Sequence, residues 1–368
     1  MVISSPGAYV TGMVKLFGLA LCLAGCGESR PAALPTASTA GSAAVATATP
    51  GFTRATLALP GGGADGVAMD YLLYDPRTKA VWVPAGNTAA VDVIDTQTHA
   101  IARIEGFPTK MMERHGKQRT VGPSSATLGE PGTVYVGNRG DFSVCAFDEK
   151  KLAKGACGTL DSMPDGIAYV ASTHEVWVTT PRDQSVRILD ATTLAQKQRL
   201  PFEGEPEGFA VDNKRGRFYT NLEDKDLTLA ISLTSHETAA TWHPKCGEDG
   251  PHGLRLAEAD GRLVVACSAE VHVLDVGGAG AIVGTLPVGD GVDDLDLDLT
   301  LAGRQTIYAG GSKSGSITIM TLLKDGSLSL RATVPTAPGA RNGVVAANGE
   351  VYLSHSQGSE LVVLSPAK

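Results

Sequence analysis

One pattern recurs in AVWVPAGN (80–87), TVYVGNRG (133–140), EVWVTTPR (175–182), RFYTNLED (217–224), RLVVACSA (262–269), TIYAGGSK (306–313) and EVYLSHSQ (350–357). β-Branched and aromatic residues dominate these segments, which is typical of strands that pack on a pleated surface. A strand that returns about every forty residues predicts an all-β fold of the β-propeller type. The number of copies predicts a seven-bladed β-propeller.

A third strand follows each copy after a short polar turn. These strands read VDVIDT (91–96), SVCAFD (143–148), VRILDA (186–191), LTLAIS (227–232), VHVLDV (271–276), ITIMTL (317–322) and LVVLSP (361–366). Their apolar runs predict sheets that are covered on both faces, as the blades of a propeller are covered by their neighbours.

The last copy ends at Lys368 after only three strands, so its fourth strand has to come from elsewhere. Residues 54–60 read RATLALP, and the fourth strand of the preceding copy, residues 331–335, reads RATVP. We therefore expect the N-terminal strand to pair with the C-terminal blade and to close the ring, which removes exposed sheet edges. The propeller is predicted to occupy residues 52–368.

The N-terminus has the pattern of an export signal. Residues 13–26 read MVKLFGLALCLAGC, and this apolar stretch is too short to cross a bilayer as a mature helix. Its end resembles the lipobox of bacterial lipoproteins, which implies that residues 1–26 are a signal peptide and that Cys26 carries a lipid anchor in a membrane. An ordinary signal peptide with a chance cysteine is the alternative.

Residues 27–51 are rich in Ala, Thr, Ser and Pro and predict a flexible tether between the anchor and the propeller. The expected localisation is the cell envelope, at the outer membrane or in the periplasm if the host has two membranes.

Four cysteines lie in the predicted propeller: Cys145, Cys157, Cys246 and Cys267. An even number of cysteines in an exported chain predicts disulfides. Cys145 and Cys157 are placed symmetrically about one predicted hairpin turn, which favours the pair 145–157 and leaves 246–267. Free buried thiols are the alternative.

The YVGN-type second strands and the DxxT turns after the third strands resemble the YVTN/YncE-like β-propeller family. The resemblance covers nearly all of residues 52–366 and implies the architecture. The family carries no universal catalytic motif, so the resemblance implies no particular reaction.

Polar residues recur about eleven positions before the first strong apolar position of the second strands. The set is Asp70, Ser124 or Ser125, Asp165, Glu207, His252, Asp294 and Asn342. In a propeller this position begins the innermost strand of a blade. The repeat therefore predicts a ring of these side chains at one mouth of the central channel.

Carboxylates held close together raise one another's pKa unless a cation neutralises them. The ring therefore predicts a bound cation, a cationic ligand or a protonated acid. The expected metal ligands are Asp165, Glu207, Asp294 and Asn342, whose oxygens suit calcium, whereas the addition of His252 admits zinc. The alternative is structural, because an Asp before a Gly often bonds to nearby backbone N–H groups in a turn.

The longest connection, residues 105–124, leads to the same mouth and is basic. It includes Arg114 and His115, which we include among the candidate ligand-binding residues. Long loops on rigid scaffolds often carry function. This loop could pair with the acidic ring or hold an anionic ligand against a cation, and a solvated loop is the alternative.

The formal net charge of -8 argues against nucleic acid as a partner, because phosphate binding needs a basic face. The sequence contains no G-x-S-x-G, HExxH or Walker A motif. We therefore expect a monomeric propeller that serves as a binding scaffold for an envelope protein or a small-molecule ligand. The alternative is a metal-dependent hydrolase resembling a lactonase, in which the ion polarises a carbonyl and Asp70 or His252 is the base.

Overall fold

The computed structural model describes residues 48–49, 51–114, 116–299 and 304–367. Helical structure in these ranges is limited to short 3-10 turns such as Gly86–Thr88 (η1), Pro181–Asp183 (η2), Glu223–Lys225 (η3) and Ser356–Gly358 (η5). None of the helices in the described ranges is long and apolar enough to cross a membrane. The all-β prediction is confirmed. The predicted signal peptide, Cys26 and most of the predicted tether lie outside the described residues.

The first four copies of the repeat form separate antiparallel sheets of four strands each. The first sheet comprises β3 (Leu73–Asp75), β4 (Ala80–Ala85), β5 (Ala90–Asp95) and β6 (Ile101–Glu105). The second comprises β9 (Pro123–Leu128), β10 (Thr133–Asn138), β11 (Ser143–Asp148) and β12 (Lys154–Thr159). The third comprises β13 (Ile167–Val170), β14 (Glu175–Thr180), β15 (Ser185–Asp190) and β16 (Gln196–Pro201). The fourth comprises β17 (Pro206–Asp212), β18 (Arg217–Leu222), β19 (Leu227–Ser232) and β20 (Thr238–Trp242).

The fifth and sixth copies share one sheet of six strands. Its strands are β21 (Leu254–Ala257), β22 (Arg262–Asp275), β23 (Ala281–Asp298), β24 (Gln305–Gly311), β25 (Ser316–Leu322) and β26 (Leu328–Pro335). The described residues therefore form six sheets of four or more strands, and the predicted seven blades are not confirmed. The difference arises because β23 continues from the fifth copy into the sixth, and Ser268 of β22 pairs with Val292 across the connection.

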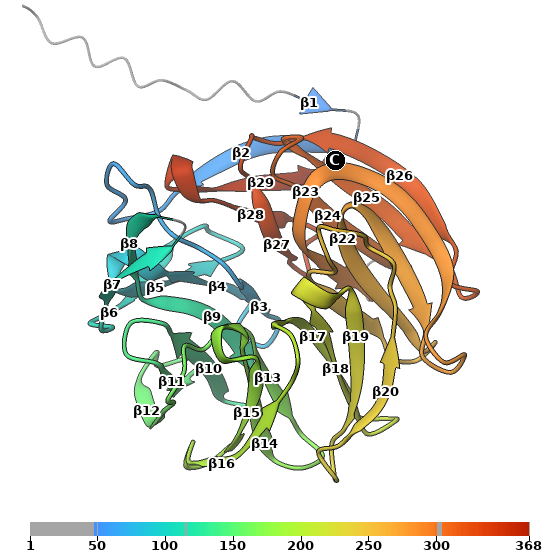
Figure 1. Cartoon of the computed structure of the whole chain (residues 1–368). Helices are drawn as coiled ribbons and strands as arrows, with labels where there is room; N and C mark the ends of the chain where they lie inside the picture. The colour runs from blue at the N-terminus through green and yellow to red at the C-terminus, as the bar shows by residue number, and fades with distance from the viewer. Residues whose placement is uncertain (1–47, 50, 115, 300–303, 368) are drawn as a thin grey trace, which may run out of the picture. The chain divides into compact units, whose positions relative to one another are not determined.

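The last sheet combines the two ends of the described chain. It contains β27 (Arg341–Val345), β28 (Val351–His355), β29 (Glu360–Pro366), β2 (Phe52–Ala58) and β1 (Ala48–Thr49). β2 pairs antiparallel with β29, with Thr56 opposite Val362. Contacts between innermost strands run from β3 through β9, β13, β17, β21, β23 and β27 and back to β3. Figure 1 shows the resulting arrangement of sheets around a common centre.

Between the first and second sheets, β7 (Lys110–Arg114) and β8 (Lys117–Val121) form a separate hairpin. This hairpin is the predicted basic loop. Its strand β8 contacts the turn η1 of the first sheet.

Apolar side chains fill the spaces between neighbouring sheets. β4 and β14 are buried along their whole length, and Trp82 and Trp177 are fully buried. This burial is what continuous apolar strands require when both faces of a sheet are covered. Both predicted disulfides are present, Cys145–Cys157 and Cys246–Cys267, so the alternative of free thiols is wrong.

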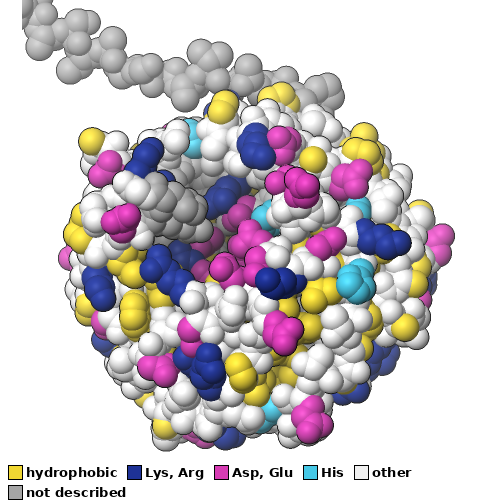
Figure 2. Space-filling view, viewed as in Figure 1, with side chains coloured by type: hydrophobic (Ala, Val, Ile, Leu, Met, Phe, Trp, Pro, Cys, Tyr) yellow, Lys and Arg dark blue, Asp and Glu magenta, His cyan; other side chains and the backbone are white. Residues whose placement is uncertain are grey.

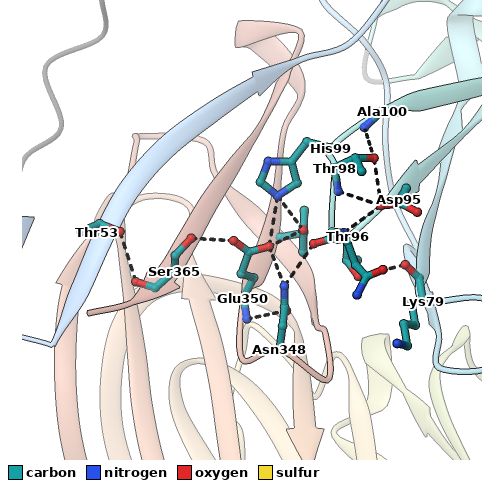
Figure 3. Close-up of polar contacts among 12 residues, drawn as sticks. Thr53, Lys79, Asp95, Thr96, Thr98, His99, Ala100, Asn348, Glu350 and Ser365 are labelled. Atoms are coloured by element: carbon teal, nitrogen blue, oxygen red, sulfur yellow. Dashed lines mark hydrogen bonds and ion pairs between the residues drawn. The ribbon is translucent and has the colours of Figure 1, made fainter. Parts of the chain in front are cut away.

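The first and last sheets are joined by one buried carboxylate, that of Glu350 (Figure 3). It accepts hydrogen bonds from Tyr352 Oη at 2.6 Å, Ser365 Oγ at 2.7 Å and Asn348 Nδ2 at 3.0 Å. His99 Nε2, in the turn between β5 and β6 of the first sheet, lies 3.1 Å from the same carboxylate. Glu350 thus fixes the last sheet to the first at the seam where the ends of the chain meet.

The third and fourth sheets are joined by the same kind of contact. Glu175 accepts a hydrogen bond from Trp177 Nε1 at 3.1 Å, and His236 Nε2 of the fourth sheet lies 3.5 Å from its carboxylate. In both contacts a glutamate stands at the start of the second strand or directly before it, and an aromatic residue follows two positions later. A histidine from the next sheet lies beside the carboxylate.

Replacing Glu350 by alanine should lower the free energy of unfolding by about 1–3 kcal/mol, because the buried hydroxyl of Tyr352 and the half-buried hydroxyl of Ser365 lose their acceptor. Burial raises the pKa of Glu350, but its hydrogen bonds outweigh burial and lower the pKa below its ordinary value of 4.5. The stabilisation is therefore present above pH 4.5 and is lost as the pH falls through the lowered pKa. Urea unfolding at several pH values measures this, with the exposed Glu203→Ala as the control. A loss no larger than that of the control would contradict the role of Glu350.

Candidate functional site

Glycines after the predicted ring residues let neighbouring innermost strands approach closely. A Cβ added to Gly208 would lie 2.1 Å from the carbonyl oxygen of His252, and one added to Gly253 would lie 2.1 Å from Asp294 Oδ1. Glycine is the residue that leaves room for such an approach. The Pro-x-Gly pattern therefore sets the spacing between ring residues of successive repeats.

Asp70 and Asp165 share one guanidinium. Arg139 Nη2 lies 2.6 Å from Asp70 Oδ2 and also pairs with Asp165 Oδ1. Tyr71 Oη donates to the other oxygen of Asp165 at 3.4 Å, and Asn342 Nδ2 lies 3.3 Å from Asp70 Oδ1. Burial raises the pKa of Asp165 to about 6 although Arg139 acts to lower it. The structure thus brings Asp70, Asp165 and Asn342 together, with an arginine already between the two acids.

Asp294 forms a second ion pair. Arg255 Nη1 and Nη2 lie 3.0 and 2.8 Å from its two oxygens, a bidentate arrangement. Burial raises the pKa of Asp294 to about 6 against the lowering effect of Arg255. The amide oxygen of Asn342 accepts the backbone N–H of Asp294 at 3.1 Å, and its Nδ2 donates to Asp293 at 2.8 Å.

The predicted metal ligands are therefore not gathered around one point. Asp165 and Asp294 each have an arginine partner, the amide of Asn342 holds neighbouring groups, and Glu207 lies elsewhere, beside His252. At Asp165 and Asp294 a guanidinium supplies a neutralising charge.

Glu207 and His252 form the third cluster together with Asp293. Among the described residues, the ligand atoms of these three side chains lie within 4.8 Å of one another. His252 Nδ1 is 3.6 Å from Glu207 Oε2 and 3.1 Å from Glu223 Oε1. Burial lowers the pKa of His252, but Glu207 and Glu223 outweigh burial and raise it to about 10. Burial also raises the pKa of Glu207, so the carboxyl and the imidazole titrate together, and the imidazole is a poor general base at neutral pH.

A pocket of about 560 Å³ is lined by His252 and Asp293 of this third cluster, and we call it the channel-mouth pocket. Its lining includes six carboxylates and three basic side chains, namely Glu205, Glu223, Asp224, Glu248, Asp249, Asp293, His252, Lys313 and Arg341. Figure 2 shows acidic side chains gathered in a hollow near the middle of this face, with basic side chains around its rim. Of the predicted ring, only His252 lines the pocket directly.

The remaining predicted residues do not add a reactive group. Ser124 and Ser125 are buried, and within the described part of the chain their Oγ atoms have no hydrogen-bond partner. No base is therefore placed to activate either hydroxyl. His115 lies outside the described residues, and only the backbone of Arg114 is described, in β7.

The sequence patterns did not point to the arginines of the site or to the acids Asp293 and Glu223. Arg139 directly follows the second strand of its copy, Asp293 directly precedes Asp294, and Glu223 is the last residue but one of the second-strand segment 217–224. Aligning the turns after the second strands, in addition to the starts of the innermost strands, would have drawn attention to Arg139 and Glu223.

No protein-family model matches the sequence, and neither does any curated protein. Solved structures that resemble it include a streptogramin B lyase, with a TM-score of 0.65 and 12% sequence identity. The match covers 86% of this chain and 99% of that chain. A catalytically inactive virginiamycin B lyase from Staphylococcus aureus with quinupristin gives 0.65 and 12% over 85% and 99%. A chain of the Kuenenia stuttgartiensis hydrazine synthase gives 0.65 and 13% over 82% and 95%. At these identities the likeness shows the β-propeller fold alone.

Proposed function

We propose that this chain is a binding protein of the cell envelope whose channel-mouth pocket takes a cationic ligand. The observation that carries the proposal is the acidic cluster around His252. Glu207 Oε2 lies 3.6 Å and Glu223 Oε1 lies 3.1 Å from His252 Nδ1, and Glu223 and Asp293 line the pocket directly. One imidazole leaves these carboxylates with an excess of negative charge, which a cationic ligand would neutralise.

The charge of the pocket supports this choice of ligand. Its six carboxylates outnumber its three basic side chains, those of His252, Lys313 and Arg341. A concave acidic surface concentrates cations and speeds their association. A volume of about 560 Å³ leaves room for a small organic cation or for a metal ion with its waters.

A binding role is favoured over the alternative of a metal-dependent hydrolase. That alternative needs Asp165, Glu207, Asp294 and Asn342 around one ion and a base beside it. Asp165 and Asp294 are each held by an arginine, and the side chains whose ligand atoms lie together among the described residues are instead Glu207, His252 and Asp293.

Isothermal titration of the purified chain with 1,4-diaminobutane, Ca²⁺ and Zn²⁺ tests the proposal. We expect saturable binding of at least one of these cations that weakens as salt is added, because exposed charges on the rim are screened. Inorganic phosphate at the same concentrations should not bind in the pocket. The absence of heat and of any thermal shift with all three cations would refute the proposal.

The rest of the architecture also belongs to the proposal. We infer a seven-bladed count, because β23 contacts both β21 and β27 in the series of innermost strands and so supplies the first strand of the sixth copy. Fast amide exchange at residues 288–291, at the rate of other connections, would support this count, and protection there would oppose it. The YVTN/YncE-like assignment, with a monomeric state and no nucleic acid partner, completes the proposal.

The envelope location rests on the lipobox-like LAGC at residues 23–26 and agrees with the two disulfides, which form in oxidising compartments. Mass spectrometry of the chain extracted from membranes should find acyl chains on Cys26. An unmodified Cys26 would rule out the anchor.

A further inference from the structure

We propose that the floor of the channel-mouth pocket is a site for a divalent transition-metal ion of the Zn²⁺ class, with Glu207, His252 and Asp293 as its ligands. This inference rests on the proposed function, since it names the cation that the pocket would take. It replaces the ligand set expected from the sequence with residues that the fold brings together.

The three ligands come from three successive innermost segments. Glu207 lies in β17, His252 in the connection before β21, and Asp293 in β23. Their ligand atoms lie within 4.8 Å of one another. Donors about 2.1 Å from one ion at tetrahedral angles are about 3.4 Å apart. The 3.6 Å between His252 Nδ1 and Glu207 Oε2 is close to that spacing.

Two of the donor atoms face each other without a hydrogen bond between them in the described structure. Glu207 Oε2 and His252 Nδ1 are both buried and lie 3.6 Å apart, and Glu223 Oε1 lies 3.1 Å from His252 Nδ1. At 3.6 Å they are too far apart for a good hydrogen bond, but they are well placed for an ion between them. The gap is therefore an observation separate from the acidity of the pocket.

The backbone and neighbouring side chains hold the donors in place. The backbone N–H of His252 donates to Ala266 at 2.9 Å, and its carbonyl accepts Asn221 Nδ2 at 2.5 Å. Asp293 is oriented by Asn342 Nδ2 at 2.8 Å and by Arg341 Nη1 at 3.1 Å. Outer hydrogen bonds of this kind fix the direction of metal-binding carboxylates.

The donor types select the metal. An imidazole nitrogen with two carboxylates suits zinc and its neighbours, whereas calcium prefers six to eight oxygens. Nδ1 must be unprotonated to bind the ion, so any proton that it carries is released to solvent when the ion binds. The fourth position would face the pocket, where water, a ligand atom or Glu223 could fill it.

The test is metal binding by the purified chain, followed by elemental analysis after dialysis and by the visible spectrum with Co²⁺ in place of Zn²⁺. We expect one Zn²⁺ per chain and a Co²⁺ spectrum of low-coordinate type. His252→Gln and the isosteric Glu207→Gln should each weaken Zn²⁺ binding at least 100-fold. The matched control is His243→Gln, because His243 is an exposed histidine of the same connection.

Circular dichroism of each variant would confirm that it folds, and Glu207→Gln keeps the test decisive if His252→Gln does not fold. No stoichiometric Zn²⁺, or Zn²⁺ binding that neither variant weakens, would overturn the inference. If Zn²⁺ fails but 1,4-diaminobutane still binds in a manner that depends on Glu207, the inference is wrong and the proposed function stands. Failure of every cation would remove both.

Discussion

Replacing Arg139 by methionine should lower the free energy of unfolding by about 3–5 kcal/mol at pH 7. Arg139 is the shared partner of Asp70 and Asp165, whose side chains are 20% and 11% exposed. Methionine keeps much of the apolar stem but leaves the two carboxylates facing each other without a cation. The uncompensated charge of Asp165, which is the more buried of the two, dominates the loss.

The loss should depend on pH in a definite direction. Burial raises the pKa of Asp165 from its ordinary value of 3.8 to about 6. The folded state therefore holds the proton of Asp165 more tightly than the unfolded state does. The cost of the buried charge is therefore complete above pH 6 and is relieved as the pH falls toward 4. Without Arg139 this cost is larger, and the deficit of the variant should shrink between pH 7 and pH 5.

Chemical denaturation of both proteins at pH 7 and pH 5 measures the effect. Arg182→Met is the matched control, because Arg182 is an exposed arginine on the same kind of turn after a second strand, and it should change stability by no more than about 0.5 kcal/mol. If Arg139→Met loses no more stability than the control, or loses the same amount at both pH values, the uncompensated charge of Asp165 is not the cause of the loss.

The propeller fold was predictable because its signal is repeated. Each second strand, such as EVWVTT at 175–180, carries the same apolar pattern, and errors in one copy are corrected by the others. The cysteine pairs were also predictable, since Cys145 and Cys157 pair across neighbouring strands β11 and β12 in register. The sheet count was not, because Gly289, Asp290 and Gly291 indicate a turn, whereas β23 continues through them as one strand.

The site could be located from the sequence but not assembled from it. The repeat identifies Asp70, Asp165, Glu207, Asp294 and His252 as equivalent positions without stating which cation accompanies each. That choice depends on side chains from neighbouring repeats, because Arg139 reaches across to Asp70 and Arg255 to Asp294. A long guanidinium contacts acids far from it in sequence, and spacing alone does not encode such a contact.

Replacing Glu207 by glutamine should weaken cation binding in the channel-mouth pocket by about 100-fold, or about 2.7 kcal/mol. Glu207 Oε2 is buried, so a bound cation would gain most of its interaction there, where water screens least. Glutamine has nearly the same shape, and the change removes the charge while leaving the packing intact.

The same substitution should change the stability of the protein without ligand by no more than about 1 kcal/mol, because the lower cost of burying an amide offsets the loss of the ion pair with His252. Glu248→Gln is the control, since Glu248 lies on the exposed rim of the same pocket and should change affinity by only about twofold. Isothermal titration gives the affinities, and thermal unfolding without ligand gives the stability. If the Glu207→Gln protein binds cations as tightly as the unmodified chain, Glu207 is not part of the binding site. The other carboxylates of the pocket would then account for the affinity.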